Sequence, residues 1–268
     1  LFHQYAPFMA MLRRTILSGK SILFTFSGGL GMNLYSLFAY YLASPLNILL
    51  LHFPETLLSE AVFVLTLVKV GFAGLAFHLF LKETFQRRGA FSVIFGAMYA
   101  LSAFVMAYSW NIMWLDALIL LPLVLWALTR FIKKGKFALY VVFLALLLIS
   151  NYYAAFFACV FMLLYFPILM SQHTVGWTGG RRLKVIMQIV AATVIAVALT
   201  AFLLLPAVQG LQHTSASGDK FPATVEFTAN PLAYLAQHFM LLEPTIRSGY
   251  PNLYSGVGTI LLLPIFFM

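Results

Sequence analysis

The chain has 268 residues, of which 63% are hydrophobic and only 9% are charged, and its formal net charge is +9. A soluble domain is nearer half apolar and a quarter charged, so this composition excludes a soluble enzyme and a disordered chain. The single cysteine, Cys159, excludes an internal disulfide framework. We therefore expect an all-α fold, a polytopic bundle of transmembrane helices.

The first segment, residues 1–56, opens with an amphipathic stretch, Tyr5–Leu17. At helical spacing its larger apolar side chains share one face: Tyr5, Phe8, Met9, Leu12 and Ile16. Arg13, Arg14 and Lys20 lie toward its end. Such a pattern is typical of an interfacial helix that lies on the membrane with its basic side toward lipid headgroups.

The glycine-rich loop Ser27–Gly31 follows, and we expect a flexible turn there, because no Lys-Ser or Lys-Thr pair makes it a phosphate loop. The next apolar stretch, Leu34–Phe53, is interrupted by Pro45 and Asn47. A crossing here would invert the side of every later basic connection, so we expect a shallow or re-entrant helix pair. Irregular backbone at membrane depth needs a covering of protein or water, which predicts a cavity around this pair.

Hydropathy predicts six transmembrane spans in residues 57–211 and the start of a further span in 257–268, since a crossing helix needs about 20 apolar residues. The six are Leu57–Leu81, Ala90–Tyr108, Met113–Ile132, Phe137–Ser150, Tyr153–Ser171 and Val185–Leu211. The fourth span is short, but the unbroken run 137–170 is too long for one crossing. A tight hairpin at Asn151–Tyr152 is therefore expected.

Most basic residues lie in alternate connections between these spans. They are Lys82, Arg87, Arg88, Arg130, Lys133, Lys134, Lys136, Arg181, Arg182 and Lys184. The positive-inside rule puts these connections in the cytoplasm, which leaves 1–56 and 212–256 as large outer loops. The positive charge is then a topology signal, and no motif or basic–aromatic surface predicts nucleic-acid binding.

Asp116, at the outer mouth of the third span, is the first candidate for chemistry. A carboxylate near membrane depth costs about 2.5–3.5 kcal/mol on insertion scales, so it usually has a partner or a function. It could act as a general base or metal ligand, or it could cap its helix, whose dipole favours it. Lys69, near the middle of the first span, should pair inside the bundle. We expect Asp116 and Glu60 to be too shallow for that pairing, by about two turns.

Two further outer segments carry polar side chains. The turn Asn151–Tyr153 could recognise a sugar through ring stacking and amide hydrogen bonds, or it could cap a helix and join the interfacial aromatic belt. The loop 212–256 contains Arg247, which could hold a phosphate through two oxygens or anchor the loop to lipid headgroups. Its stretch Tyr234–Leu242 is amphipathic enough for a second interfacial helix.

Six short motifs follow one another along the chain. They are Leu1-Phe-His-Gln-Tyr5, Gly28-Gly-Leu-Gly-Met-Asn33, Ala39-Tyr-Tyr-Leu-Ala-Ser-Pro-Leu-Asn47, Trp114-Leu-Asp-Ala-Leu118 with Leu121-Pro122, Ser150-Asn-Tyr-Tyr153 and Pro251-Asn-Leu-Tyr254. In this order and spacing the chain resembles the bacterial YfhO family over its whole length. Family chains are longer, and this chain lacks a starting Met and stops within an apolar run, so we expect a fragment.

The resemblance implies a GT-C glycosyltransferase fold in the bacterial cell membrane. It also implies transfer of a sugar from a polyprenyl-phosphate carrier to a cell-envelope polymer, such as lipoteichoic acid, at the outer leaflet. Family chains usually carry an Asp directly before the first motif, and GT-C enzymes commonly use an acidic residue of the first outer loop as the base. The resemblance therefore puts the base immediately before Leu1.

Such a transfer needs a carboxylate to take the acceptor proton and cations to hold the carrier phosphate. We expect Asp116 to help as a catalytic residue or to bind a divalent cation, and Arg13, Arg14 or Arg247 to hold the phosphate. The side chains expected to line the cleft are Gln4, Tyr5, Asn33, Asn151 and Tyr152. Two alternatives stay open: a lipid or polymer transporter, which would show internal repeats, and a membrane scaffold without chemistry.

Overall fold

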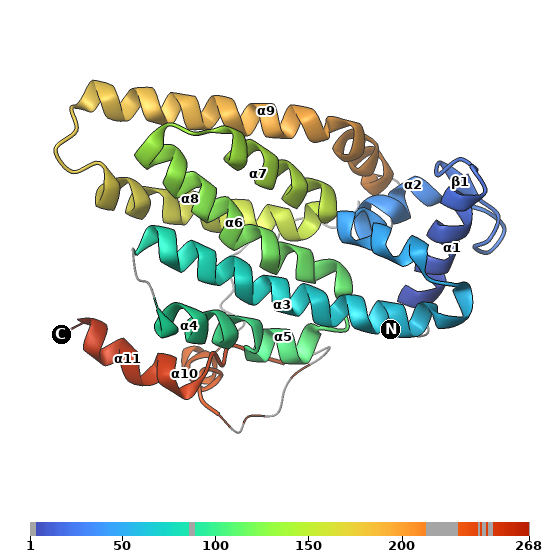
Figure 1. Cartoon of the computed structure of the whole chain (residues 1–268), viewed down its shortest axis with the longest axis horizontal. Helices are drawn as coiled ribbons and strands as arrows, with labels where there is room; N and C mark the ends of the chain where they lie inside the picture. The colour runs from blue at the N-terminus through green and yellow to red at the C-terminus, as the bar shows by residue number, and fades with distance from the viewer. Residues whose placement is uncertain are drawn as a thin grey trace.

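The computed structural model describes residues 4–85, 89–212, 230–240, 242, 245 and 249–267. Most of its helices run side by side along the long axis of the molecule, and α1 lies across one end (Figure 1). The first elements are α1 (Tyr5–Leu17), β1 (Phe24–Thr25), β2 (Met32–Asn33), α2 (Leu34–Leu37), η1 (Phe38–Leu42), η2 (Pro45–His52), η3 (Glu55–Leu57), α3 (Leu58–Thr84), α4 (Ala90–Ala100) and α5 (Ala103–Tyr108). The later elements are α6 (Ile112–Lys134), α7 (Ala138–Ser150), α8 (Tyr152–His173), α9 (Gly179–Gln212), α10 (Pro231–Ala236) and α11 (Val257–Phe267).

The predicted all-α polytopic fold is confirmed. In the described part of the chain, five helical segments are long and apolar enough to cross a membrane, namely η3 with α3, α4 with α5, α6, α8 and α9. α7 has only 13 residues, fewer than the roughly 20 that a crossing needs, yet it packs between α6 and α9. The six-span division of residues 57–211 therefore stays a prediction. The predicted reversal after α7 is confirmed, because only Asn151 separates α7 from α8.

The stretch Leu34–Phe53 forms the sharply bent helix pair that its sequence predicts. Leu34–Leu42 and Pro45–His52, here called the bent pair, meet at 100°. Pro45 ends the first helix because a proline offers no N–H and disfavours helical backbone in the residue before it. The elbow of the bent pair, residues 43–44, lies against α3 and α6, which places an irregular segment beside the two central helices.

α1 has the predicted bounds, but its surroundings differ from the expectation. Its buried side chains are Tyr5, Ala6, Met9, Leu12 and Thr15. They pack on α3 and on the bent pair, whereas Ile16, expected on the same face, is 43% exposed. Protein covers most of the apolar face of α1, so the helix is an integral part of the fold, and the contact of its basic side with lipid headgroups stays a prediction.

α3 and α6 form the centre of the bundle, and α4 packs against α3. The contact between α3 and α4 is close because two glycines meet there. A Cβ atom added to Gly96 would lie 2.7 Å from the carbonyl oxygen of Gly74. Small residues let membrane helices approach to backbone contact, which adds packing without any hydrophobic driving force between helices.

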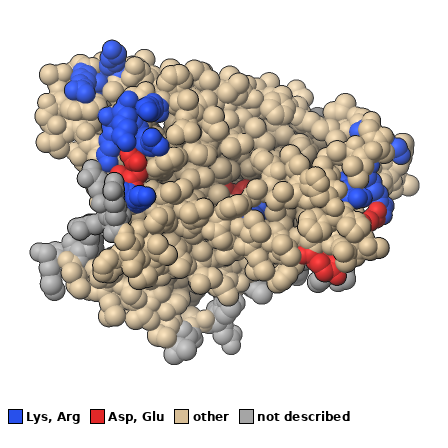
Figure 2. Space-filling model, in the orientation of Figure 1, with Lys and Arg blue, Asp and Glu red and all other residues tan. Residues whose placement is uncertain are grey.

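Charged side chains gather at the two ends of the molecule and leave its long middle nearly uncharged on the face shown (Figure 2). One group lies at the end where α8 is joined to α9, and the other lies at the end crossed by α1, here called the α1 end (Figures 1 and 2). An uncharged middle between two charged ends is the surface that a bilayer-spanning bundle needs. The sidedness of the two ends stays a prediction of the positive-inside rule.

The second predicted interfacial helix is shorter and begins earlier than expected. α10 runs over Pro231–Ala236 in place of Tyr234–Leu242. Asn230 sets its start, because the side chain of Asn230 accepts a hydrogen bond from the N–H of Leu232 at 2.9 Å and a proline fills the first helical position. α11 begins at Val257, where the sequence predicts a further apolar helix.

Candidate functional site

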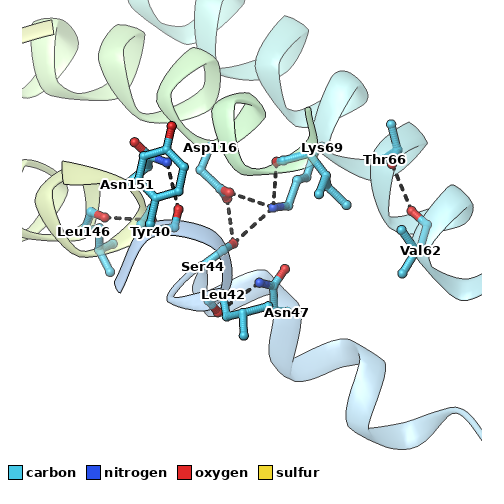
Figure 3. A network of polar contacts seen from close by, with 12 residues as sticks. Tyr40, Leu42, Ser44, Asn47, Val62, Thr66, Lys69, Asp116, Leu146 and Asn151 are labelled. Atoms are coloured by element: carbon cyan, nitrogen blue, oxygen red, sulfur yellow. Dashed lines mark hydrogen bonds and ion pairs between the residues drawn. The ribbon is translucent and has the colours of Figure 1, made fainter. Parts of the chain in front are cut away.

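A buried ion pair joins the two central helices at the elbow of the bent pair. Nζ of Lys69, on α3, lies 2.6 Å from Oδ2 of Asp116, on α6. Ser44, in the elbow, donates to Oδ1 of Asp116 at 2.8 Å and accepts from Nζ of Lys69 at 3.2 Å (Figure 3). Lys69 also donates to the carbonyl oxygen of Ile112 at 3.3 Å. Three segments far apart in the sequence are thus tied at one point.

The three polar side chains of this network are closed to solvent, and they are satisfied by one another and by the carbonyl oxygen of Ile112. Lys69 is 0% exposed, Asp116 2% and Ser44 4%. The ammonium has an acceptor for each of its three N–H groups, and each carboxylate oxygen accepts a hydrogen bond. Because the cost of burying two charges largely offsets their attraction, the pair fixes geometry more than it stabilises the fold.

The partner of Lys69 corrects the expectation that Asp116 is too shallow. Lys69 is the twelfth residue of α3, yet its ammonium reaches the carbonyl of Ile112, the first residue of α6. α3 and α6 are therefore offset along their axes. Counting residues from the start of each helix measures depth only if the helices begin at the same level, and these two do not.

The geometry also bears on the roles considered for Asp116. Its carboxylate does not cap α6, since both oxygens bond to Lys69 and Ser44. A general base must reach the proton that it removes, directly or through one water, and a carboxylate 2% exposed offers no such approach in this conformation. Around Asp116, the described residues supply no group of three or more His, Cys, Asp or Glu side chains. The divalent cation stays a hypothesis.

Beside this network, aromatic and amide side chains meet at the α1 end. Tyr5 donates to Oδ1 of Asn111, just before α6, at 2.8 Å. Gln4 donates through Nε2 to the hydroxyl of Tyr41 at 3.2 Å, and the rings of Tyr5 and Tyr41 meet edge-on with centroids 5.9 Å apart. Burial, followed by the neighbouring Tyr41 and Tyr40, raises the pKa of Tyr5 well above its usual value. The Tyr5 hydroxyl therefore stays a hydrogen-bond donor at physiological pH.

Asn151 and Tyr152 reach the same place from the start of α8. Asn151 caps α8 by accepting from the N–H of Ala154 at 2.8 Å, and its Nδ2 donates to the carbonyl oxygen of Tyr40 at 3.0 Å. The ring of Tyr152 lies 5.8 Å from that of Tyr40. The structure therefore shows the interpretation of this turn in which Asn151 caps α8. Sugar recognition stays a prediction. We call the assembled set the tyrosine–amide cluster: Gln4, Tyr5, Tyr40, Tyr41, Asn111, Asn151 and Tyr152.

The other predicted ligands lie away from this cluster or outside the described residues. Arg14 forms an exposed ion pair with both carboxylate oxygens of Glu55. Arg13 is partly buried, and its Nε has no hydrogen-bond partner in the described part of the chain. Asn33 is exposed and caps α2 through its side-chain oxygen. Arg247 falls among the residues that the structure does not describe, so its role as a phosphate ligand stays a prediction.

Two pockets lie beside α1. One has a volume of about 330 Å³, lies between α1 and the bent pair, and includes Ser44 and Asn47 in its lining. The other has a volume of about 620 Å³ and lies between α1 and the β1–β2 hairpin. The cavity expected around the bent pair is therefore present, with a mostly apolar lining that includes Ser44 of the buried network.

Three residues of the site had no clear signal in the sequence: Ser44, Tyr41 and Asn111. Ser44 precedes a proline, where a serine is ordinarily a turn residue. Tyr41 lies in an apolar stretch and Asn111 in a short connection, so each resembles a belt or loop residue. Their role depends on contacts across 72, 37 and 106 positions of sequence, which no local pattern encodes.

Comparison with models of known protein families gives a match over the whole chain. The family model described as bacterial membrane protein YfhO matches residues 1–268. The chain belongs to the YfhO family. As a YfhO protein with several apolar helices, it is a multi-pass bacterial membrane protein. No curated protein and no solved structure matches it.

Proposed function

We propose that this YfhO-family protein is a membrane glycosyltransferase that moves a sugar from a polyprenyl-phosphate carrier to a cell-envelope polymer of the lipoteichoic acid kind. The observation that carries the proposal is the convergence of α1, the bent pair and the starts of α6 and α8 at the α1 end. This end holds the tyrosine–amide cluster and both pockets beside α1. It lies opposite the basic connections, so the positive-inside rule makes it the outer face.

The side chains at the α1 end suit transfer from a lipid phosphate. A polyprenyl phosphate is a good leaving group, so the site chiefly has to hold its charge and orient the acceptor hydroxyl. Arg14, which lies away from the cluster and is paired with Glu55, is the proposed phosphate ligand, while the rings and amides of the cluster supply stacking and hydrogen bonds for a sugar. The resemblance assigns the base to an acidic residue directly before Leu1, and the nearby Gln4 and Tyr5 belong to the cluster.

Asp116 enters this proposal as a positioning residue. Its carboxylate is held by Lys69 and acts through Ser44, which fixes the elbow beside the cluster. Asp116→Asn removes the countercharge of Lys69 and weakens the hold on the elbow. We therefore expect the substitution to abolish most of the sugar transfer.

The test uses full-length protein in membranes with a polyprenyl-phosphate carrier that bears a labelled sugar, and with a polymer acceptor. Asp116→Asn should transfer little label at normal expression, and activity near the wild-type level would show that the assigned role is wrong. The pH profile of the residual activity separates the two roles of Asp116. A positioning residue leaves the acidic limb of the profile in place, whereas loss of the base removes that limb.

A further inference from the structure

The larger pocket lies outside the tyrosine–amide cluster, between α1 and the hairpin formed by β1 and β2, and has a volume of about 620 Å³. Its apolar wall includes Phe8, Met11, Phe24, Phe26 and Met32. Arg14 and Lys20 also line it. A pocket of this size with an aromatic wall and two cations can hold part of an amphiphilic ligand.

Two glycines of the Ser27–Gly31 loop shape this pocket. A Cβ atom on Gly28 would collide with Sδ of Met32, and one on Gly31 would lie 2.6 Å from the ring of Phe24. Gly31 also has a φ of +116°, which L side chains rarely adopt. The loop is therefore more than a flexible turn, because its glycines let Met32 and Phe24 fold back over it and line the pocket.

The charges around the pocket leave one cation without a partner. Arg14 is neutralised by its ion pair with Glu55. The side chain of Lys20 is exposed and forms no hydrogen bond or ion pair within the described residues. The side chains of Arg14, Glu55 and Lys20 together carry one net positive charge, which attracts an anionic phosphate group.

Large apolar side chains are exposed on and beside the hairpin. They are Leu23, Phe24, Phe26 and Leu30, with Phe26 81% and Leu30 102% exposed. Exposed apolar groups next to an unpaired cation complement a molecule with an anionic head and a hydrocarbon chain.

We propose that this pocket binds the phosphate head of a membrane lipid. Lys20 is the main charged contact and Arg14 the second, while the first part of the hydrocarbon chain lies against Phe24 and Phe26. Two sources carry this chemistry. One is the polyprenyl-phosphate carrier, which rests on the proposed function, and the other is an anionic phospholipid, which does not.

The experiment measures lipid binding to the full-length protein in nanodiscs of neutral phosphatidylcholine. Labelled polyprenyl phosphate and labelled phosphatidylglycerol are titrated separately. Lys20→Gln should weaken binding about fivefold, the effect of one basic residue near a lipid surface. Glu55→Gln frees Arg14 from its ion pair and should strengthen binding. Lys136→Gln is the matched control and should bind like the wild type, because Lys136 is an exposed lysine in the connection between α6 and α7.

The two lipids distinguish the sources. If Lys20→Gln weakens the binding of polyprenyl phosphate more than that of phosphatidylglycerol, the pocket is assigned to the carrier. If the substitution weakens the binding of both lipids equally, the pocket is assigned to lipid phosphate in general. The proposal is overturned if Lys20→Gln and Glu55→Gln both bind like the wild type, or if neutral lipid competes equally well. This assay contains no sugar and no acceptor, so it is independent of the transfer assay described above. Lipid binding that responds to the variants, together with no sugar transfer in the transfer assay, would refute the proposed function alone. Transfer with unaltered lipid binding in both variants would refute the pocket alone.

Discussion

The ammonium of Lys69 lies 2.6 Å from the carboxylate of Asp116, and solvent reaches neither group to any useful extent. Through Ser44 the same pair holds the elbow of the bent pair, so α3, α6 and the irregular segment before them share one fixed point. The arrangement of the α1 end therefore depends on two charges that no ligand needs to touch.

Removing either charge alone should destabilise the fold strongly. Lys69→Met or Asp116→Leu leaves one buried charge without its partner, which typically costs about 3–5 kcal/mol. The double variant removes both charges, and replacement of a buried pair by apolar side chains is often neutral or stabilising. Thermal unfolding of purified protein in detergent should show a large loss in each single variant and recovery in the double variant.

The exposed pair of Lys134 and Glu83 provides the control for this comparison. Their side chains are 49% and 24% exposed, and the charged atoms lie 3.3 Å apart. Exposed pairs contribute about 0–1 kcal/mol, so Lys134→Met should barely change the unfolding temperature. A double Lys69 and Asp116 variant as unstable as the single variants would argue against the pair as the source of the effect.

Ser44→Ala tests the link between the pair and the elbow. The substitution takes the donor from one oxygen of Asp116, and an unsatisfied buried acceptor costs about 1–3 kcal/mol. Hydrogen exchange should increase in the bent pair while α3 and α6 stay protected, and sugar transfer should fall. Ser44→Thr keeps the hydroxyl and should restore part of both. Unchanged exchange in the bent pair of Ser44→Ala would mean that the hydroxyl does not hold the elbow.

The contact between α3 and α4 predicts that substitution by alanine changes the stability differently at two glycines. Gly96→Ala brings a Cβ atom against the carbonyl of Gly74, and such overpacking typically costs about 1–3 kcal/mol. Gly71, on α3, has nothing within 4 Å of an added Cβ atom, so Gly71→Ala should be neutral or slightly stabilising. Unfolding temperatures of the two variants make the comparison, and equal losses would contradict the close approach of the helices.

Substitutions of Asn151 distinguish a structural role of its side chain from a role in sugar recognition. Asn151→Ala removes the cap of α8, which costs about 0.5–2 kcal/mol, and leaves the carbonyl of Tyr40 without its donor. Asn151→Ser keeps a capping oxygen and should lose less stability. If the amide acts only on the sugar, both variants will unfold like the wild type and differ from it only in the KM for the donor.

Hydropathy predicted most of the helix bounds because each apolar run ends at a local signal. The bend at Pro45 and the start of α8 after Asn151 follow from backbone chemistry that a single residue encodes. The surroundings of α1 could not be predicted in this way. An amphipathic pattern states that one face is buried, but it does not distinguish lipid from the protein surface of α3.

The site was predictable only in part, for the same reason. Gln4, Tyr5 and Tyr152 were expected to lie in one cleft, and all three contact the tyrosine–amide cluster because they lie at helix starts that converge at the α1 end. The pairing of Lys69 with Asp116 depends on the axial offset of two helices. That offset is set by tertiary packing, and the sequence of neither helix encodes it.

The proposed function is tested most directly in sealed vesicles that contain the full-length protein, with the labelled sugar carrier in the outer leaflet and polymer acceptor outside. We predict that the label appears in the polymer and that Asp116→Asn transfers little. Label that never reaches the polymer and instead becomes protected inside the vesicles would contradict the glycosyltransferase and indicate a transporter.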